Sequence, residues 1–235
     1  MTLQKTEIRL KASDNFSVEE AFKVLRTNIQ FSGPNIKVIS FTSSNENEGK
    51  TSVSLGIARS FAELGKKVLV IDADMRKSVI ASVYSDAIQP IGLSELLSKQ
   101  AEPEACIYQT QYKLFHMIFS GKYPPNPAEL LNGNIFNELL ASARDIYDYI
   151  FIDTPPLNVV IDAAIIAPKC DGTIIVLGNG RTTNSQLRNV INQLHKSNSH
   201  ILGLVRTGAD ASRGDGYYGY GSSAKKKKKH HRKQN

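Results

Sequence analysis

The chain has 235 residues, of which 41% are apolar, and its formal net charge is +7. This length fits one large domain or two small ones, with enough apolar side chains for a full hydrophobic core. No apolar run approaches the roughly 18–20 residues of a membrane-spanning helix, and no signal-peptide pattern is found. The two cysteines, Cys106 and Cys170, form no CxxC pair, which disfavours zinc, iron–sulfur and disulfide frameworks. We therefore expect a cytoplasmic globular protein.

The positive charge is concentrated at the C-terminus. Seven of the 29 basic residues lie after Ala224, so the others balance the 22 acidic residues, and nucleic-acid binding is not indicated. The basic run 225–233 has two interpretations: a solvated charge run, or a tether to anionic lipid, to which each Lys or Arg contributes about 1 kcal/mol. We predict a flexible N-terminus over 1–16, one domain over 17–208, and a flexible Gly-, Tyr- and Lys-rich tail over 209–235.

The first predicted elements are an N-terminal helix and a strand–loop–helix unit. The helix begins near Ser17, where Ser17 to Glu20 has the S-x-x-E form of a capping box. The buried strand 38–41 then leads into the loop 44–51, and the following segment has apolar residues at helical spacing up to Gly65, a C-terminal cap. This is the context of a phosphate-binding loop, although its usual first glycine is replaced by Ser44.

The loop predicts how a nucleotide is held. Backbone N–H groups at the helix N-terminus cradle phosphates, Lys50 reaches the β- and γ-phosphate oxygens, and the Thr51 hydroxyl ligates Mg²⁺. The predicted nucleotide-binding residues in this segment are Ser44, Asn45, Asn47, Glu48, Gly49, Lys50, Thr51 and Ser52.

Two further buried strands each end in carboxylates. The run 68–71 is followed by Asp72 and Asp74, with Arg76 close behind, and the run 149–152 is followed by Asp153. Open α/β sheets bind ligands at the carboxyl ends of their strands, and Asp153 is placed like the acid of a Walker B strand. We therefore expect these acids and the phosphate-binding loop to form one Mg-ATP site.

The rest of the chain continues the alternation of strands and helices. We predict strands over 114–119, 173–177 and 201–205, and helices over 134–143, 162–170 and 184–197. Buried strands alternating with amphipathic helices indicate an α/β fold with a doubly wound, mostly parallel sheet.

Six segments carry a resemblance to a known family. They are Glu20–Phe31 (EAFKVLRTNIQF), Thr42–Thr51, Val68–Arg76, Gly92–Leu97 (GLSELL), Pro124–Leu131 (PPNPAELL) and Ile152–Pro156. With these segments the chain resembles the bacterial tyrosine kinases of capsule and exopolysaccharide systems, specifically the separate cytoplasmic kinase subunit of Gram-positive bacteria. The resemblance implies a P-loop NTPase architecture of the MinD/ParA type.

The resemblance also implies the roles of individual residues. The cofactors are ATP and Mg²⁺. The implied catalytic residues are Lys50, Asp72, Asp74, Arg76 and Asp153, and the implied metal ligands are Thr51, Asp72 and Asp153. Asp72 is the candidate acceptor of the tyrosine proton. Thr207 occupies the place of an asparagine that the family associates with the adenine. Asn47 stands where the family has glycine, and asparagine accommodates a left-handed backbone.

Substrates and partners are implied in the same way. The phosphorylated residues are expected to be Tyr217, Tyr218 and Tyr220 in the tail of a neighbouring subunit. Glu20, Lys23 and Arg26 match the family's E-x-x-R-x-x-R subunit-contact pattern, with lysine replacing one arginine. Such subunits assemble into homo-oligomers, including rings, and are opposed by a tyrosine phosphatase. The cytoplasmic tail of a membrane regulator of polysaccharide chain length activates them, so we expect peripheral localisation at the inner face of the membrane through this partner.

Two other functions compete with the kinase. One is a ParA/MinD-type ATPase switch, but its signature lysine would fall at position 45, where this chain has Asn45. The other is a catalytically weak nucleotide-binding scaffold of a polysaccharide assembly complex. Incubation with Mg-ATP and detection of phosphotyrosine, alongside Lys50→Met, separates these possibilities.

Overall fold

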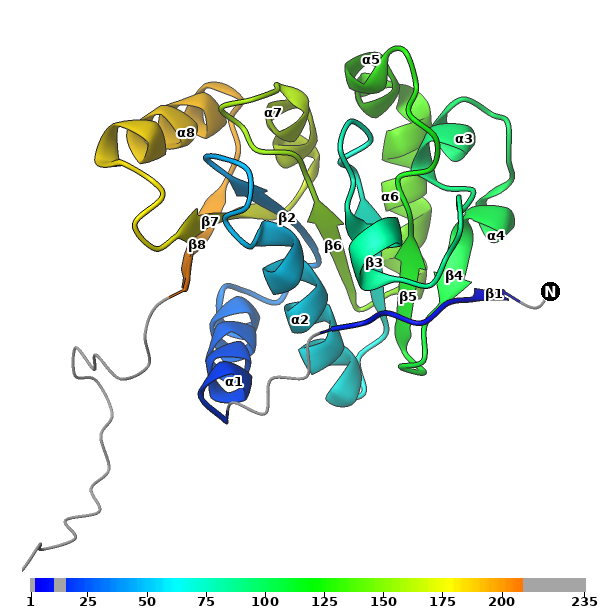
Figure 1. Cartoon of the computed structure of the whole chain (residues 1–235), viewed down its shortest axis with the longest axis horizontal. Coiled ribbons are helices and arrows are strands. Elements are labelled where there is room, and N and C mark those ends of the chain that lie inside the picture. Colours follow the sequence, from blue (N-terminus) through cyan, green and yellow to red (C-terminus); the bar gives the residue numbers. More distant parts are fainter. Residues whose placement is uncertain (1–2, 11–15, 209–235) are drawn as a thin grey trace, which may run out of the picture.

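A computed structural model of the chain describes residues 3–10 and 16–208, which form a sheet with helices on both of its faces (Figure 1). The strands are β1 (Gln4–Lys5), β2 (Val38–Ser43), β3 (Val68–Asp72), β4 (Ile107–Gln109), β5 (Phe115–Ile118), β6 (Tyr149–Asp153), β7 (Gly172–Gly178) and β8 (Ile201–Thr207). The helical elements are α1 (Phe16–Phe31), α2 (Lys50–Glu63), η1 (Ile80–Tyr84), α3 (Leu93–Leu97), α4 (Pro103–Cys106), α5 (Pro127–Asn132), α6 (Asn134–Ile146), α7 (Asp162–Ile166), η2 (Ala167–Lys169) and α8 (Asn184–Lys196).

The sheet is mostly parallel, which confirms the predicted fold class. Its strand order is β1-β4-β5-β3-β6-β2-β7-β8, and β4 and β5 are its antiparallel pair. From β2 the chain adds β3, β4 and β5 toward one edge of the sheet, and it then returns through β6 to β7 and β8 at the other edge. Because β3, β6 and β2 are parallel neighbours, their carboxyl ends meet at one edge, where a doubly wound sheet binds its ligand.

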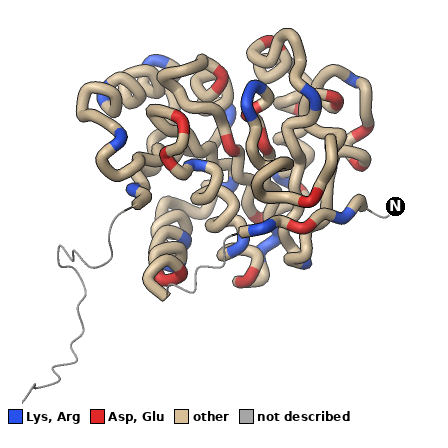
Figure 2. Tube along the Cα trace, in the orientation of Figure 1, with Lys and Arg blue, Asp and Glu red and all other residues tan. Residues whose placement is uncertain are grey.

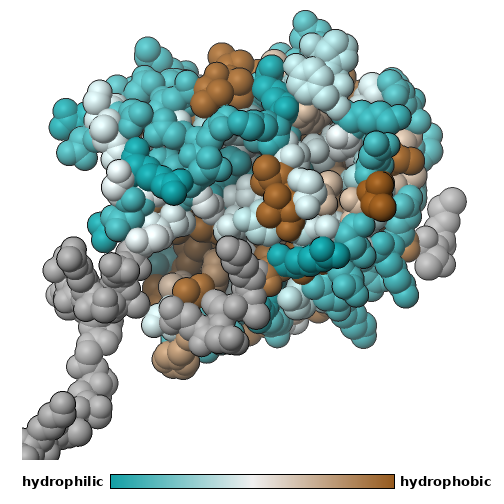
Figure 3. Space-filling model, viewed as in Figure 1, coloured by the Kyte–Doolittle hydropathy of each residue, from teal (hydrophilic) through white to brown (hydrophobic). Residues whose placement is uncertain are grey.

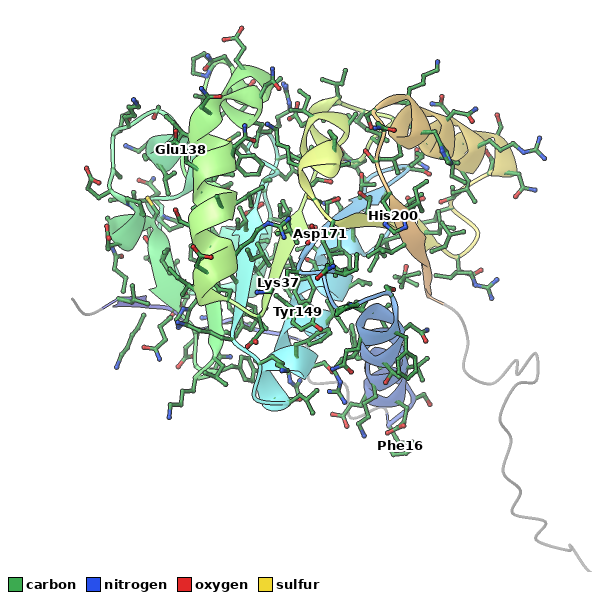
Figure 4. The ribbon with its side chains drawn as sticks, turned by 180° about the vertical axis from the view of Figure 1, so that it is seen from behind. Phe16, Lys37, Glu138, Tyr149, Asp171 and His200 are labelled. Carbon is green, nitrogen blue, oxygen red and sulfur yellow. The ribbon has the colours of Figure 1, made fainter. Side chains whose placement is uncertain are left out.

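Each face of the sheet buries its own apolar cluster. Helices α1 and α2 cover one face, where Leu55, Ile57 and Phe61 of α2 are fully buried against the strands. Helices α3, α5, α6 and α7 pack on the other face, and α6 lies in front of the strands when the molecule is seen from behind (Figure 4). The segments GLSELL and PPNPAELL form α3 and α5 on this second face, so their leucines belong to the core.

Residues 3–10 differ from the expectation of a flexible N-terminus. Strand β1 pairs in parallel with β4, Ile8 is 1% exposed, and the Ile8 backbone N–H donates to the side chain of Gln111. Strands β1 and β4 are two and three residues long, too short to show a periodic pattern in the sequence. The N-terminal segment is therefore part of the packed structure over these residues.

The composition predicted a balance of basic and acidic residues in the part of the chain before the basic run, and their distribution agrees with this. Basic and acidic residues are interspersed along the described trace (Figure 2). The tail 209–235, which contains the three candidate tyrosines and the basic run, lies outside the described residues.

Candidate active site

Three carboxylates come together because their strands are neighbours. Asp72 at the end of β3 stands in register with Asp153 at the end of β6, and Asp153 is in turn in register with Phe41 of β2. Strand β2 leads directly into the phosphate-binding loop. The sheet therefore sets the acids beside the loop, and a one-residue shift in register would turn them to the opposite face.

Lys50 and Thr51, the first residues of α2, face these acids. The Lys50 Nζ lies 3.9 Å from Asp74 Oδ2 and 3.8 Å from Asp153 Oδ2. The Thr51 hydroxyl donates a hydrogen bond of 2.6 Å to the same Asp153 oxygen. The other oxygen of Asp153, Oδ1, is buried and has no hydrogen-bond partner within the described residues. One acceptor is thus left over at the centre of the cluster.

A cavity of about 380 Å³ opens between three loops. The phosphate-binding loop, the segment after β3 and the segment after β6 contribute its walls. The polar residues that line it include Lys50, Thr51, Asp72, Asp74 and Asp153. All five are among the predicted catalytic and metal-binding residues, so the structure brings that part of the predicted site into one cavity.

Burial perturbs the acidity of two carboxyl groups in the cluster, Asp72 and Asp153. Burial, together with the nearby charge of Asp153, raises the pKa of Asp72 to about 8, although a hydrogen bond donated by the Ser78 hydroxyl opposes the rise. Burial also raises the pKa of Asp153, although the charge of Lys50 opposes this. Buried carboxyls with raised pKa values suit proton transfer and cation binding. No motif in the sequence indicated the contact between Ser78 and Asp72.

The phosphate-binding loop has the backbone shape that its sequence suggested. Asn47 has φ of 60° and Gly49 has φ of 87°, both in the left-handed region. A Cβ on Gly49 would also lie 3.1 Å from a methyl carbon of Thr207. Asparagine therefore takes the left-handed position predicted for it, whereas Gly49 combines a left-handed backbone with a tight contact.

Glu48 organises the loop from within. Its side chain is buried and accepts hydrogen bonds from the backbone N–H groups of Ser44 and Asn45, at 2.8 and 3.0 Å. The Thr182 hydroxyl, from the segment between β7 and α8, donates to the same carboxylate. Glu48 was predicted to bind the nucleotide. Its carboxylate is engaged with the loop backbone, so its contribution to a nucleotide would come from its main chain.

The segment after β7 and the first turn of α8 support the outer side of the loop at two more points. Arg181 donates a hydrogen bond of 2.7 Å to the Asn47 carbonyl, and Gln186 donates one of 3.3 Å to the Asn45 side chain. Sequence reasoning missed these residues because they lie more than 130 positions from the loop.

Arg76 makes an ion pair that the sequence did not predict. Its Nε donates to Asp162 Oδ2 at 2.7 Å and its Nη2 donates to Asp162 Oδ1 at 3.1 Å. Asp162, the first residue of α7, is fully buried. Arg76 also lines the cavity, so this bidentate pair fixes the guanidinium at the cavity wall and joins the loops that follow β3 and β6.

The remaining predicted nucleotide ligands lie at the edge of the site. The Ser52 hydroxyl is 2.7 Å from the phenolic oxygen of Tyr84, and Thr207 donates a hydrogen bond of 2.7 Å to the Glu48 carbonyl. Glu46 forms an exposed ion pair of 2.7 Å with Lys77. Thr207 therefore contacts the phosphate-binding loop from the end of β8.

Known proteins share this combination of fold and site. The AAA domain family matches residues 36–203. The tyrosine-protein kinase CpsD of Streptococcus pneumoniae serotype 4 is 42% identical over 194 residues, which cover 83% of this chain and 86% of that protein. The chain belongs to the bacterial tyrosine kinase family. Its P-loop domain is accordingly a protein-tyrosine kinase domain that uses a nucleotide.

Solved structures support the assignment of this chain to the bacterial tyrosine kinase family. The kinase domain of the Escherichia coli tyrosine kinase ETK superposes with a TM-score of 0.82 at 31% identity, covering 92% of this chain and 86% of that chain. The chimerical protein CapA2B2 gives a TM-score of 0.79 at 25% identity, covering 87% of this chain and 93% of that one. Within the described residues of the kinase, no helix has the length and apolar character needed to cross a membrane.

The predicted subunit contacts of the kinase lie on α1. Glu20 and Lys23 form an exposed ion pair of 2.6 Å within the helix. Arg26 instead donates hydrogen bonds of 2.8 and 2.9 Å to the carbonyl and hydroxyl of Ser60, which hold α1 against α2. Ser17 lies inside α1, whose described part begins at Phe16, one residue before the predicted start. A groove of about 970 Å³ runs between α1, α2 and the end of β8.

The residues at the centre of the kinase site fit a magnesium ion together with phosphates. The described residues contain no cluster of three or more His, Cys, Asp and Glu spaced to hold a metal. Mg²⁺, however, is usually bound through one or two carboxylates, substrate phosphates and waters. The Thr51 hydroxyl, the unpartnered Asp153 Oδ1 and the nearby Asp72 supply such oxygen donors beside the phosphate-binding loop.

Proposed function

We propose that this kinase transfers the γ-phosphoryl group of ATP to Tyr217, Tyr218 and Tyr220 in the tail of a neighbouring copy. The observation that supports this most strongly is the arrangement of Lys50 among three carboxylates in one cavity at the end of the central strands. Phosphoryl transfer needs positioned cations for the phosphates and an oxygen acceptor for the hydroxyl proton, and the cavity offers both.

The nucleotide-binding residues have distinct roles in this proposal. The N–H groups at the start of α2 and the Lys50 ammonium hold the phosphates, and Thr51, Asp72 and Asp153 hold Mg²⁺. When bound, Mg²⁺ neutralises charge that develops on the β- and γ-phosphate oxygens. Ser52 and Thr207 contact the nucleoside side, and Arg76 supplies guanidinium charge from the wall to which Asp162 fixes it.

In the transfer step, one carboxylate acts as the base that accepts the phenolic proton. The tyrosine oxygen forms a bond to the γ-phosphorus while the bond from that phosphorus to the bridging oxygen breaks, and ADP leaves with the electron pair. The phenolic proton passes to Asp72, with Asp74 as support. A base must first be ionised. Burial raises the pKa of Asp72 to about 8, and the charge of Lys50 opposes this rise, so ionisation of Asp72 as the base depends on the cations that the site gathers.

Regulation by partners is the second part of the proposal. One solved relative is the chimerical protein CapA2B2, and the matched Streptococcus protein is the tyrosine-protein kinase CpsD. We infer that the cytoplasmic tail of a membrane regulator of polysaccharide chain length activates this kinase and holds it at the inner face of the membrane. Glu20, Lys23 and Arg26 then contribute to contacts in a homo-oligomer, up to a ring, and a tyrosine phosphatase reverses the modification.

The test is an autophosphorylation assay with two copies of the full chain. An active copy is mixed with a larger, tagged Lys50→Met copy and Mg-ATP, with and without the cytoplasmic peptide of a membrane regulator. We expect phosphotyrosine on the Lys50→Met copy, and its loss when the three tail tyrosines of that copy are changed to Phe. ATP hydrolysis without phosphotyrosine would instead indicate a nucleotide switch, and neither activity would indicate a scaffold.

Replacement of Asp72 and Asp74 separately assigns the base. If Asp72 is the base, Asp72→Asn abolishes transfer, whereas Asp74→Asn leaves a slower reaction with the same dependence on acceptor concentration. The reverse pattern would assign the base to Asp74.

A further inference from the structure

One wall of the catalytic cavity differs in chemistry from the others. The phosphate-binding loop supplies polar groups on one side, whereas Val79, Val159 and Val160 line the cavity from the segments after β3 and β6. Pro156 lines the same wall. Phosphates gain nothing from apolar side chains, so this wall requires a different occupant from the phosphate groups of the nucleotide.

The apolar wall continues outward as an exposed rim. Val79 and Val159 are 40% and 57% exposed, so both extend from the cavity to the surface. Single exposed valines are common on protein surfaces. Here two of them belong to the cavity that holds the carboxylates. Brown, hydrophobic patches also lie on this face of the molecule between teal, hydrophilic areas (Figure 3).

The carboxylates lie at the bottom of the cavity. Asp72 is 0% exposed, Asp153 is 1% exposed and Asp74 is 7% exposed. An acceptor hydroxyl must therefore be carried inward from a backbone that stays at the rim. The tyrosine hydroxyl stands at the far end of a rigid ring with apolar faces, whereas the serine and threonine hydroxyls stand next to the backbone. The depth of the acids and the apolar wall both favour tyrosine.

We propose that Val79 and Val159 form the acceptor subsite, which receives the ring of a tyrosine from segment 216–221 of a second copy. This inference rests on the proposed function and adds the residues that select the acceptor. The segment reads Gly-Tyr-Tyr-Gly-Tyr-Gly, so a residue without a side chain flanks each tyrosine and lets the backbone approach the rim. Eight residues lie between Gly208 and Tyr217, and an extended chain of this length reaches up to about 30 Å.

The subsite can be tested with acceptor and nucleotide measured separately. The acceptor is the tagged full chain with Lys50→Met, and the phosphorylating copies are wild type, the double variant Val79→Ser/Val159→Ser, and the matched control Val83→Ser. Val83 is exposed to the same degree as Val159 but does not line the cavity. Melting temperature and the affinity for a fluorescent ATP analogue are measured for each copy.

We expect the double variant to raise the apparent KM for the acceptor chain roughly tenfold, because two apolar contacts with the ring are lost. Its affinity for the ATP analogue and its melting temperature should match those of the wild type, and Val83→Ser should change the KM less than twofold. An acceptor in which the three tail tyrosines are serines should receive no phosphate.

The contrary outcomes separate the two proposals. If the wild type phosphorylates the acceptor and the double variant does so with the same KM, or if serine acceptors are phosphorylated, the subsite is wrong while the proposed function stands. A parallel loss of ATP affinity would also overturn the subsite, because the valines would then serve the nucleotide. If the wild type transfers no phosphate to the tail, the proposed function fails and the subsite fails with it.

Discussion

Replacing Asp72 with Asn should stabilise the folded protein, and the gain should depend on pH. Folded Asp72 keeps its proton up to a pKa of about 8, whereas an unfolded aspartate loses it near 3.8. Between these values unfolding releases one proton. A folded-state pKa that is raised makes stability highest at low pH and lowers it as pH rises through this window. Asp72→Asn removes the titration and retains an oxygen that can accept the Ser78 hydrogen bond.

The magnitude follows from the release of one proton. Each pH unit inside the window changes the free energy of unfolding by about 1.4 kcal/mol, so the advantage of Asp72→Asn should grow by about 2–3 kcal/mol between pH 5 and pH 7. The expected growth does not depend on the constant cost or gain of the substitution itself. Asp153, whose pKa burial also raises, is present in both proteins and contributes to both curves.

Urea unfolding of the two full-length proteins, in EDTA and without nucleotide, measures this difference at pH 5, 6 and 7. Asp145→Asn, an exposed substitution on α6, is the matched control and should show no such trend. An advantage of Asp72→Asn that stays constant across the range would show that Asp72 is already ionised in the folded protein, and would refute the argument for a raised pKa.

Three further substitutions test the packing around the site. Gly56→Ala should destabilise the fold by about 1–3 kcal/mol, because its Cβ would lie 2.2 Å from the ring of Phe22 on α1; thermal unfolding measures this. Asp162→Asn should lower kcat for tyrosine phosphorylation by about tenfold with little change in the KM for ATP, because Arg76 loses the bidentate partner that positions it. Asp171→Asn should lower the free energy of unfolding at pH 7 by about 1–2 kcal/mol. Burial raises the pKa of Asp171, but its ion pair with Arg144 and two backbone N–H groups outweigh burial and lower the pKa, so the loss should shrink as pH falls through the folded-state pKa.

Each of these substitutions has an outcome that would contradict its reasoning. Gly203→Ala is the control for the first, since a Cβ there meets no atom within 4 Å, and an equal loss in both variants would argue against the contact with α1. An unchanged kcat in Asp162→Asn would show that the ion pair of Asp162 with Arg76 has only a structural role. For Asp171, which lies beside the start of β2 (Figure 4), a stability loss that stays constant as pH falls through the acid range would exclude the charge as its cause.

The sequence by itself determined the fold class, the family and the shape of the phosphate-binding loop. Buried parallel strands appear as short apolar runs, and the residues after them, Asp72 and Asp153, must meet at one edge of the sheet once the strands pair. The left-handed backbone of Asn47 was also predictable, because few residues tolerate that conformation and glycine is absent there. These properties depend on local sequence and on rules that hold for every sheet of this class.

The tertiary structure alone decided how the site is supported. Arg76 pairs with Asp162, 86 positions away, and Thr182 contacts Glu48 across 134 positions. Strands β1 and β4 form although they are too short to leave a periodic pattern. For each of these residues, the neighbouring sequence does not indicate which distant residue it contacts. The contacts form because the packed sheet and helices bring distant segments within hydrogen-bonding distance. Local conformational preferences and short motifs do not predict that proximity.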